Sequence, residues 1–240
     1  MTYSIDDTQR RWAVAIGAAY LIALVLGNIA EFYIPDQLIV YDNAVQTARN
    51  IMAHEHLFRL GVAANFLVFA TDVVLVAGLY MVLEPVNRGL ALLAAFFRLI
   101  ETTALFMVTL SDFAVLKILG GAEYLKALDA ATLAILARLA IAGHGSAYTL
   151  GLLIFGFGST IFCWLWLKSG YVPKPLAMLG VFASAWIGAC VFAIMVAPEA
   201  AKVLPLPVWA TPIFIFELAM GLGLVIRRLP QSPSMRGQPL

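Results

Sequence analysis

Six long apolar stretches set the tightest limit on how this 240-residue chain can fold. Each is close to or above the roughly 20 residues that an α-helix needs to cross about 30 Å of hydrocarbon. Lipid offers no hydrogen bonds to an open backbone, so such stretches are expected to be helical. The predicted spans are residues 12–33, 57–83, 90–116, 143–167, 175–196 and 208–226.

The composition is typical of a membrane protein. Hydrophobic residues make up 62% of the chain and charged residues 12%, whereas soluble domains hold about half and about a quarter. A net charge of +1 without a basic run excludes the footprint of a nucleic-acid-binding protein. We therefore predict an all-α, polytopic six-helix membrane domain at residues 12–228, with a cytoplasmic segment at 1–11 and a flexible tail at 229–240.

The positions of Lys and Arg predict the orientation. Of these 15 residues, eight lie on the side of the two termini, six lie on the other side, and Arg98 falls within a span. Cytoplasmic loops carry an excess of Lys and Arg, so both termini are predicted to be cytoplasmic, in a bacterial inner membrane. Between the third and fourth spans, residues 120–142 contain EYLKALDAATLAILARLAI, which predicts an additional amphipathic helix.

Four ionisable residues lie near the middle of three of the spans: Asp72, Arg98, Glu101 and Glu217. A charge in hydrocarbon is costly, so such a residue suggests a functional site by default. At a helix rise of about 1.5 Å per residue, all four fall in one layer near the middle of the membrane. Because three carboxylates face one arginine, at least one of them should be protonated, bind a cation or meet water. Together with Asn65, which shares a helix face with Asp72, they form a predicted pocket for a small ligand or an ion.

The same layer also has a purely structural interpretation. Buried ion pairs of Arg98 with Asp72 and Glu217 would fix the register of the helices without binding anything. On the third span, however, polar side chains recur at i, i+3, i+4 spacing from this layer to the outer end of the helix. That pattern favours a polar cavity that opens on the non-cytoplasmic side. The polar residues on this face are Arg98, Glu101, Thr102, Thr109 and Asp112.

A second, outer polar cluster is predicted where spans reach the non-cytoplasmic surface. Its members are Glu31, Arg59, Asp112, His144 and Tyr148, with His54 and His56 as further candidates from the adjoining loop. Simple solvation at the membrane boundary would also explain these residues. The triplet His54-Glu55-His56 places its two histidines at i and i+2, where they diverge on a helix, and no cysteine joins them. We therefore expect no metal site and no cofactor.

Four segments carry a resemblance to a known family. They are LFRLG at 57–61, LYMVLEPVNRGLALLAAFFRL at 79–99, IFGFGSTIFCWLWLKSGYVPKPLAMLG at 154–180 and FELAMGL at 216–222. Over about residues 10–228 the chain resembles a family of bacterial multi-helix membrane proteins labelled domain of unknown function 4386. The resemblance implies a fold and a membrane topology. It implies no activity, and it assigns no role to Arg59, Asp72, Arg98 or Glu217.

These observations favour a pocket for a small ligand or ion, serving transport or sensing. The lack of a clear internal repeat weakens the transporter form of this hypothesis. One alternative is an intramembrane enzyme that acts on a lipid or isoprenoid through the outer His and acidic residues. Another alternative is a structural or partner-binding membrane subunit. Gly180, Ser184 and Gly188 form a ridge of small residues that suits close helix packing, within the bundle or in a homo-oligomer.

Overall fold

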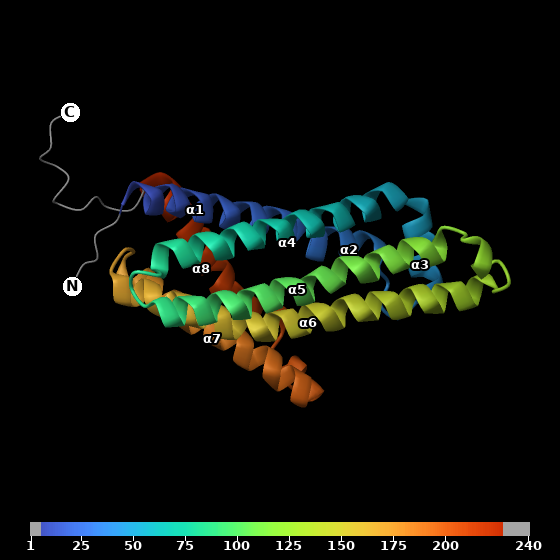
Figure 1. Ribbon diagram of the computed structural model, residues 1–240. Helices are drawn as coiled ribbons and strands as arrows, with labels where there is room; N and C mark the ends of the chain where they lie inside the picture. Colours follow the sequence, from blue (N-terminus) through green and yellow to red (C-terminus); the bar gives the residue numbers. More distant parts are fainter. Residues whose placement is uncertain (1–5, 228–240) are drawn as a thin grey trace, which may run out of the picture. The chain divides into compact units, whose positions relative to one another are not determined.

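The computed structural model describes residues 6–227, which form helices and short connections without a strand (Figure 1). Six helical stretches are long and apolar enough to cross a membrane, which confirms the predicted all-α polytopic bundle. The expected flexible tail at 229–240 lies outside the described residues. The long helices are α1 (Asp7–Asn28), α4 (Glu55–Leu83), α5 (Arg88–Leu119), α6 (Ala130–Ser169), α7 (Lys174–Val196) and α8 (Leu206–Arg227).

The first span has an irregular end. After α1 the chain passes through the π-helical segment η1 (Ile29–Tyr33) into the short helix α2 (Ile34–Leu38). A π-helical turn within an α-helix is rare and occurs often at functional sites. The remaining short elements are α3 (Ala44–Ala53), η2 (Glu123–Leu125) and η3 (Pro198–Lys202).

The separate amphipathic helix expected at residues 120–142 is not confirmed. Residues from Ala130 onward belong instead to α6, a continuous helix of 40 residues. At about 1.5 Å per residue, α6 is about 60 Å long, twice the thickness of the hydrocarbon core. Its first turn is capped by Asp129, whose carboxylate accepts hydrogen bonds from the backbone N–H of Thr132 at 2.8 Å and from its hydroxyl at 3.0 Å. These hydrogen bonds lower the pKa of Asp129.

The described chain forms two compact units. Unit 1 takes in the described residues of Met1–Leu24, Thr71–Glu101 and Leu152–Leu240, and unit 2 takes in Val25–Ala70 and Thr102–Gly151. Helices α1, α4, α5 and α6 contribute residues to both units, whereas α7 and α8 belong to unit 1 and α3 belongs to unit 2.

Unit 1 is built on closely packed helices. Its core includes the fully buried side chains of Ile16, Leu79, Phe162, Trp166, Phe216 and Met220. Helices α6 and α7 approach each other so closely that a Cβ atom on Gly156 would lie 2.7 Å from the Cα of Gly188. The small-residue ridge of α7 therefore serves packing within unit 1.

Unit 2 has its own apolar core and a hydrogen-bonded turn that joins α2 to α3. The core residues are Ile34, Leu38, Ile51, Phe58, Val62, Val115, Ala137 and Ile141. The hydroxyl of Thr47 accepts a hydrogen bond from the backbone N–H of Val40 and donates one to its carbonyl, both at 2.9 Å. Asn43 caps α3 by accepting a hydrogen bond from the backbone N–H of Gln46. These contacts fix the shape of the α2–α3 turn.

Candidate functional site

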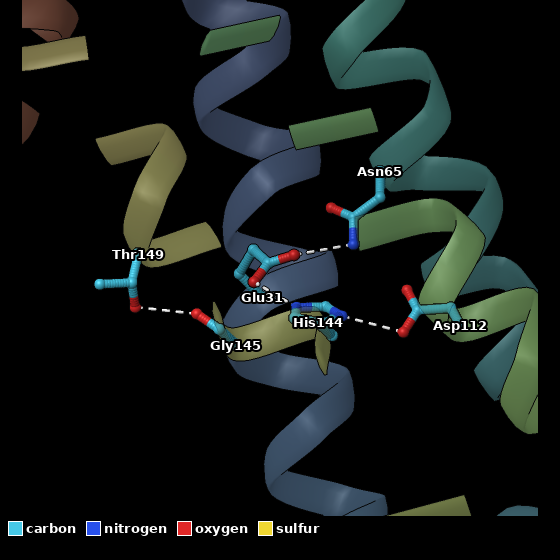
Figure 2. Close-up of polar contacts among 6 residues, drawn as sticks. All are labelled: Glu31, Asn65, Asp112, His144, Gly145 and Thr149. Atoms are coloured by element: carbon cyan, nitrogen blue, oxygen red, sulfur yellow. Dashed lines mark hydrogen bonds and ion pairs between the residues drawn. The ribbon is translucent and has the colours of Figure 1, made fainter. Parts of the chain in front are cut away.

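Four polar side chains from four parts of the chain meet within unit 2. Glu31 comes from η1, Asn65 from α4, Asp112 from α5 and His144 from α6, and Figure 2 shows them turned toward one another. All four are half-buried or buried in the apolar surroundings of this unit. Glu31, Asp112 and His144 were predicted to cluster from their places at the outer ends of the spans, and the structure brings them into contact.

His144 occupies the centre of this group. Its Nδ1 lies 2.9 Å from Oδ1 of Asp112, and its Nε2 lies 3.1 Å from Oε2 of Glu31. An ionised carboxylate only accepts hydrogen bonds. Both contacts are therefore hydrogen bonds only when both ring nitrogens carry protons or when one carboxyl group is protonated. Either state gives the group a net charge of −1, counting the two acids and the imidazole.

The remaining oxygen of Glu31 is also engaged. The amide of Asn65 donates a hydrogen bond to Oε1 of Glu31 at 2.7 Å, and its side chain also interacts with Asp112. Glu31 lies in the middle of the π-helical segment, which shifts the register of side chains that follow it relative to a regular helix. The irregular turn therefore sits at the residue that connects Asn65 to His144.

A cavity of about 340 Å³ lies beside these four residues. All its lining residues belong to unit 2. The wall is mainly apolar. Its polar part consists of the four residues described above, together with Tyr41, Arg138 and Tyr148. The apolar residues of the wall include Ala30, Ile34, Leu38, Phe58, Val62 and Ile141.

Arg138 and Tyr41 were not predicted as site residues, yet both line the cavity. The Nε of Arg138 donates a hydrogen bond to the carbonyl of Tyr41 at 3.3 Å, and the guanidinium lies 5.5 Å from the centre of the Tyr41 ring. From the sequence alone, Arg138 fits a residue at the membrane boundary whose side chain extends into water. The signal that could have found it is the i, i+3, i+7, i+10 spacing of Arg138, Ile141, Gly145 and Tyr148 along one face of α6.

Other members of the predicted outer cluster take different positions. Tyr148 lines the cavity. Arg59 instead pairs with Glu55, one turn earlier on the exposed surface of α4, at 2.6 Å. His54 contacts the backbone carbonyl of Asn50, and His56 is exposed. Within residues 6–227, no group of three or more His, Cys, Asp or Glu side chains has the arrangement of a metal site.

Unit 1 contains one of the two buried ion pairs that the sequence suggested, Arg98 with Asp72, and Arg98 takes Glu101 rather than Glu217 as its second partner. Arg98 lies 3.7 Å from Asp72 and 3.2 Å from Glu101, and its guanidinium is 4.5 Å from the centre of the Phe155 ring. The side chains of Arg98 and Glu101 are 4% and 2% exposed, so this cluster is shielded from solvent within the chain itself. Glu217 acts on Arg98 and Asp72 through longer-range electrostatic interactions.

Asn65 does not join the Asp72 layer with which the sequence grouped it. It lies in unit 2 beside Glu31. The polar residues predicted along one face of α5 are all buried: Arg98, Glu101, Thr102, Thr109 and Asp112.

Comparison with known proteins places the chain in a family. The model of a family described as a domain of unknown function, DUF4386, matches residues 15–227, which is most of the chain. The chain therefore belongs to the DUF4386 family. No curated protein and no solved structure matches it.

Proposed function

We propose that this DUF4386 protein binds a small ligand in the cavity of unit 2, in the service of sensing or transport at a bacterial inner membrane. The observation that carries the proposal is the cavity itself, a space of about 340 Å³ with a mainly apolar wall and one convergent polar group. Small-molecule sites typically measure about 300–1,000 Å³ and combine an apolar lining with a few placed polar side chains.

The polar group would fix the orientation of a ligand in such a site. Glu31, Asp112 and His144 come from three different helical segments, so each contact depends on the packing of unit 2 as a whole. A ligand that altered this hydrogen-bond network would change how the segments are held together. That property suits sensing, and it also suits the binding step of transport.

The ion pairs of unit 1 fit a structural role better. Arg98 is bound on two sides by carboxylates and on a third by the Phe155 ring. We propose that this cluster fixes the packing of the helices of unit 1. A role for Asp72, Arg98, Glu101 and Glu217 in binding a ligand remains the alternative.

Catalysis through the outer cluster has weaker support from the geometry. A histidine that acts as a general base needs a ring nitrogen directed at the proton it removes. Both ring nitrogens of His144 face carboxylates instead. An enzyme acting on a lipid or isoprenoid would have to break one of these contacts during its cycle.

The proposed orientation keeps both termini in the cytoplasm, as the Lys and Arg distribution indicates. A reporter domain fused after residue 228 should then be active in its cytoplasmic form. Activity of a periplasmic reporter at the same junction would reverse this orientation.

The ligand proposal can be tested without knowing the ligand. Gly145 lines the cavity, and a Cβ atom added to it meets nothing within 4 Å. Gly27 lies in the same unit and also has open space around an added Cβ, but it does not line the cavity. Gly145→Leu and Gly27→Leu are therefore a matched pair, with Val62→Phe as a second change to the cavity wall.

The purified parent and variants would be extracted and compared by mass spectrometry for small molecules that they retain. We expect a molecule that is retained by the parent and by Gly27→Leu but is depleted in Gly145→Leu and Val62→Phe. Equal retention in all four folded proteins, or no retained molecule in the parent, would count against the cavity as a binding site.

A further inference from the structure

The contacting group of Glu31, Asp112 and His144 beside the cavity of unit 2 carries an excess of negative charge. Glu31 and Asp112 supply two negative charges, and His144, their shared ion-pair partner, supplies at most one positive charge. The side chains of the two acids are 10% and 8% exposed, so water screens the excess charge poorly. A group of this kind is stabilised by one further positive charge.

Arg138 does not supply that charge by direct contact. Among the residues that the structure describes, it forms no ion pair with a carboxylate, and its guanidinium is instead engaged by the carbonyl and ring of Tyr41. The engagement with Tyr41 also weakens Arg138 as a site for an anion. Arg138 adds a positive charge to the cavity wall, but it forms no ion pair with Glu31 or Asp112, whose excess charge a positively charged ligand beside them would offset.

A second observation on α5 is independent of these charges. Thr109 is buried to 3% exposure, and its hydroxyl has no hydrogen-bond partner among the described residues. Other helical hydroxyls, on Ser146, Thr149 and Thr160, donate to the carbonyl four residues earlier in their own helix. Thr109 lies one turn before Asp112 on the same face of α5, so a buried hydroxyl without such a partner lies near the polar group, although Thr109 does not itself line the cavity.

The size and wall of the cavity indicate what kind of positive charge fits. A bare metal ion needs several ligands that converge on one point, and no such group of His, Cys, Asp or Glu exists within residues 6–227. The space of about 340 Å³ is far larger than one ion, and its wall is lined by side chains such as Leu38, Phe58 and Val62. An apolar body attached to the charge would remove this wall from contact with water.

From these observations, and resting on the proposed function, we infer that the cavity binds a small organic ammonium ion. Its ammonium group lies beside Glu31 and Asp112, and its apolar body packs against Leu38, Phe58 and Val62. The carboxylates then serve as charge-assisted hydrogen-bond acceptors, which are stronger than neutral ones. The ammonium restores the local charge balance without displacing His144 from between the two acids.

The test uses three probes with the same ring and different charge: benzylammonium, benzyl alcohol and benzoate. Each is titrated calorimetrically into the purified full-length protein in detergent. We expect saturable binding of benzylammonium and none of the other two. Glu31→Gln keeps the shape of the side chain and removes its charge, and it should weaken benzylammonium binding about tenfold or more. Asp112→Asn, the second variant, should do the same.

The matched control is Glu55→Gln. It removes an equal charge from the exposed surface of unit 2, where Glu55 pairs with Arg59, and it should bind benzylammonium as the parent does. Thermal unfolding of each variant establishes that it is folded. Benzyltrimethylammonium, which has the charge but no N–H donor, should bind more weakly than benzylammonium.

Each contrary result has its own meaning. Equal binding of benzyl alcohol, or stronger binding of benzoate, overturns the ammonium inference and leaves a ligand cavity of another chemistry. Binding of benzylammonium that is unchanged in Glu31→Gln and Asp112→Asn also overturns it, because the probe then partitions elsewhere. If benzylammonium does not bind at all, the inference fails, and the comparison of retained molecules in Gly145→Leu decides separately whether the cavity binds any ligand.

Discussion

The Nε2 atom of His144 lies 3.1 Å from Oε2 of Glu31, a residue 113 positions earlier in the chain. The same imidazole contacts Asp112 on a third helical segment through its other nitrogen. Because one ring joins two acids that would otherwise repel each other, its removal should affect the stability of the protein as well as any binding in unit 2.

Replacing His144 by alanine should therefore destabilise the protein by about 1–3 kcal/mol, since Glu31 and Asp112 lose their shared partner. Thermal unfolding in detergent measures the change. His54→Ala is the control, because His54 is exposed and contacts only a carbonyl of the preceding turn. A second change, Glu31→Gln, should restore part of the stability lost in His144→Ala. Additive effects of the two changes would show that the pair is not coupled in solution.

Arg98 in unit 1 should be far more sensitive to replacement than a surface arginine. Removal of one partner from a buried ion pair costs about 3–5 kcal/mol, since the other charge is left without compensation. Arg98→Met should lose about this much stability, and the double variant Arg98→Met, Glu101→Gln should recover part of it. Arg88→Met is the control, because Arg88 pairs with Glu84 on the exposed surface. Equal stability of the two single variants would contradict a structural role for the Arg98 cluster.

The close contact between α6 and α7 predicts a third result. A Cβ atom on Gly156 would overlap the backbone at Gly188, so Gly156→Leu should destabilise the protein by about 1–3 kcal/mol or more. Gly223→Leu on α8 places the same side chain where an added Cβ meets nothing within 4 Å, and it should leave the unfolding midpoint unchanged or raised. Similar midpoints for both variants would mean that the helices separate easily at Gly156.

The fold followed from the sequence because the length of an apolar stretch is itself the physical requirement for crossing a bilayer. The continuous α6 did not follow. Charged residues such as Lys126 and Arg138 resemble those of a surface helix, but the chain turns at η2 and then runs as one helix from Ala130. Nothing in the pattern marks a break at residue 142, because helical periodicity does not reveal where a helix leaves the hydrocarbon.

The candidate site was predictable only in part. Depth estimated from the rise per residue placed Asp72, Arg98, Glu101 and Glu217 in one layer, and the outer ends of the spans grouped Glu31, Asp112 and His144 near one surface. Depth does not fix which neighbouring helix a face meets, so Asn65 was grouped with Asp72 rather than with Glu31. The cavity could not be predicted, because its volume depends on how the α2–α3 turn and the side chains of unit 2 pack.

The last prediction compares the cavity with the buried layer through cysteine labelling. In a background that lacks Cys163 and Cys190, Val62→Cys places a thiol at a residue that is 5% exposed but lines the cavity, whereas Glu101→Cys places one at a residue that is 2% exposed and does not line it. A small, membrane-impermeant thiol reagent added to intact cells should label Val62→Cys and leave Glu101→Cys unlabelled in folded protein, because a thiol reacts only where the reagent can reach it. Adding Gly145→Leu to Val62→Cys should slow labelling, and adding Gly27→Leu should not. Labelling of Glu101→Cys at the rate of Val62→Cys would instead favour a ligand path through the ionic layer and would contradict the structural role proposed for Arg98.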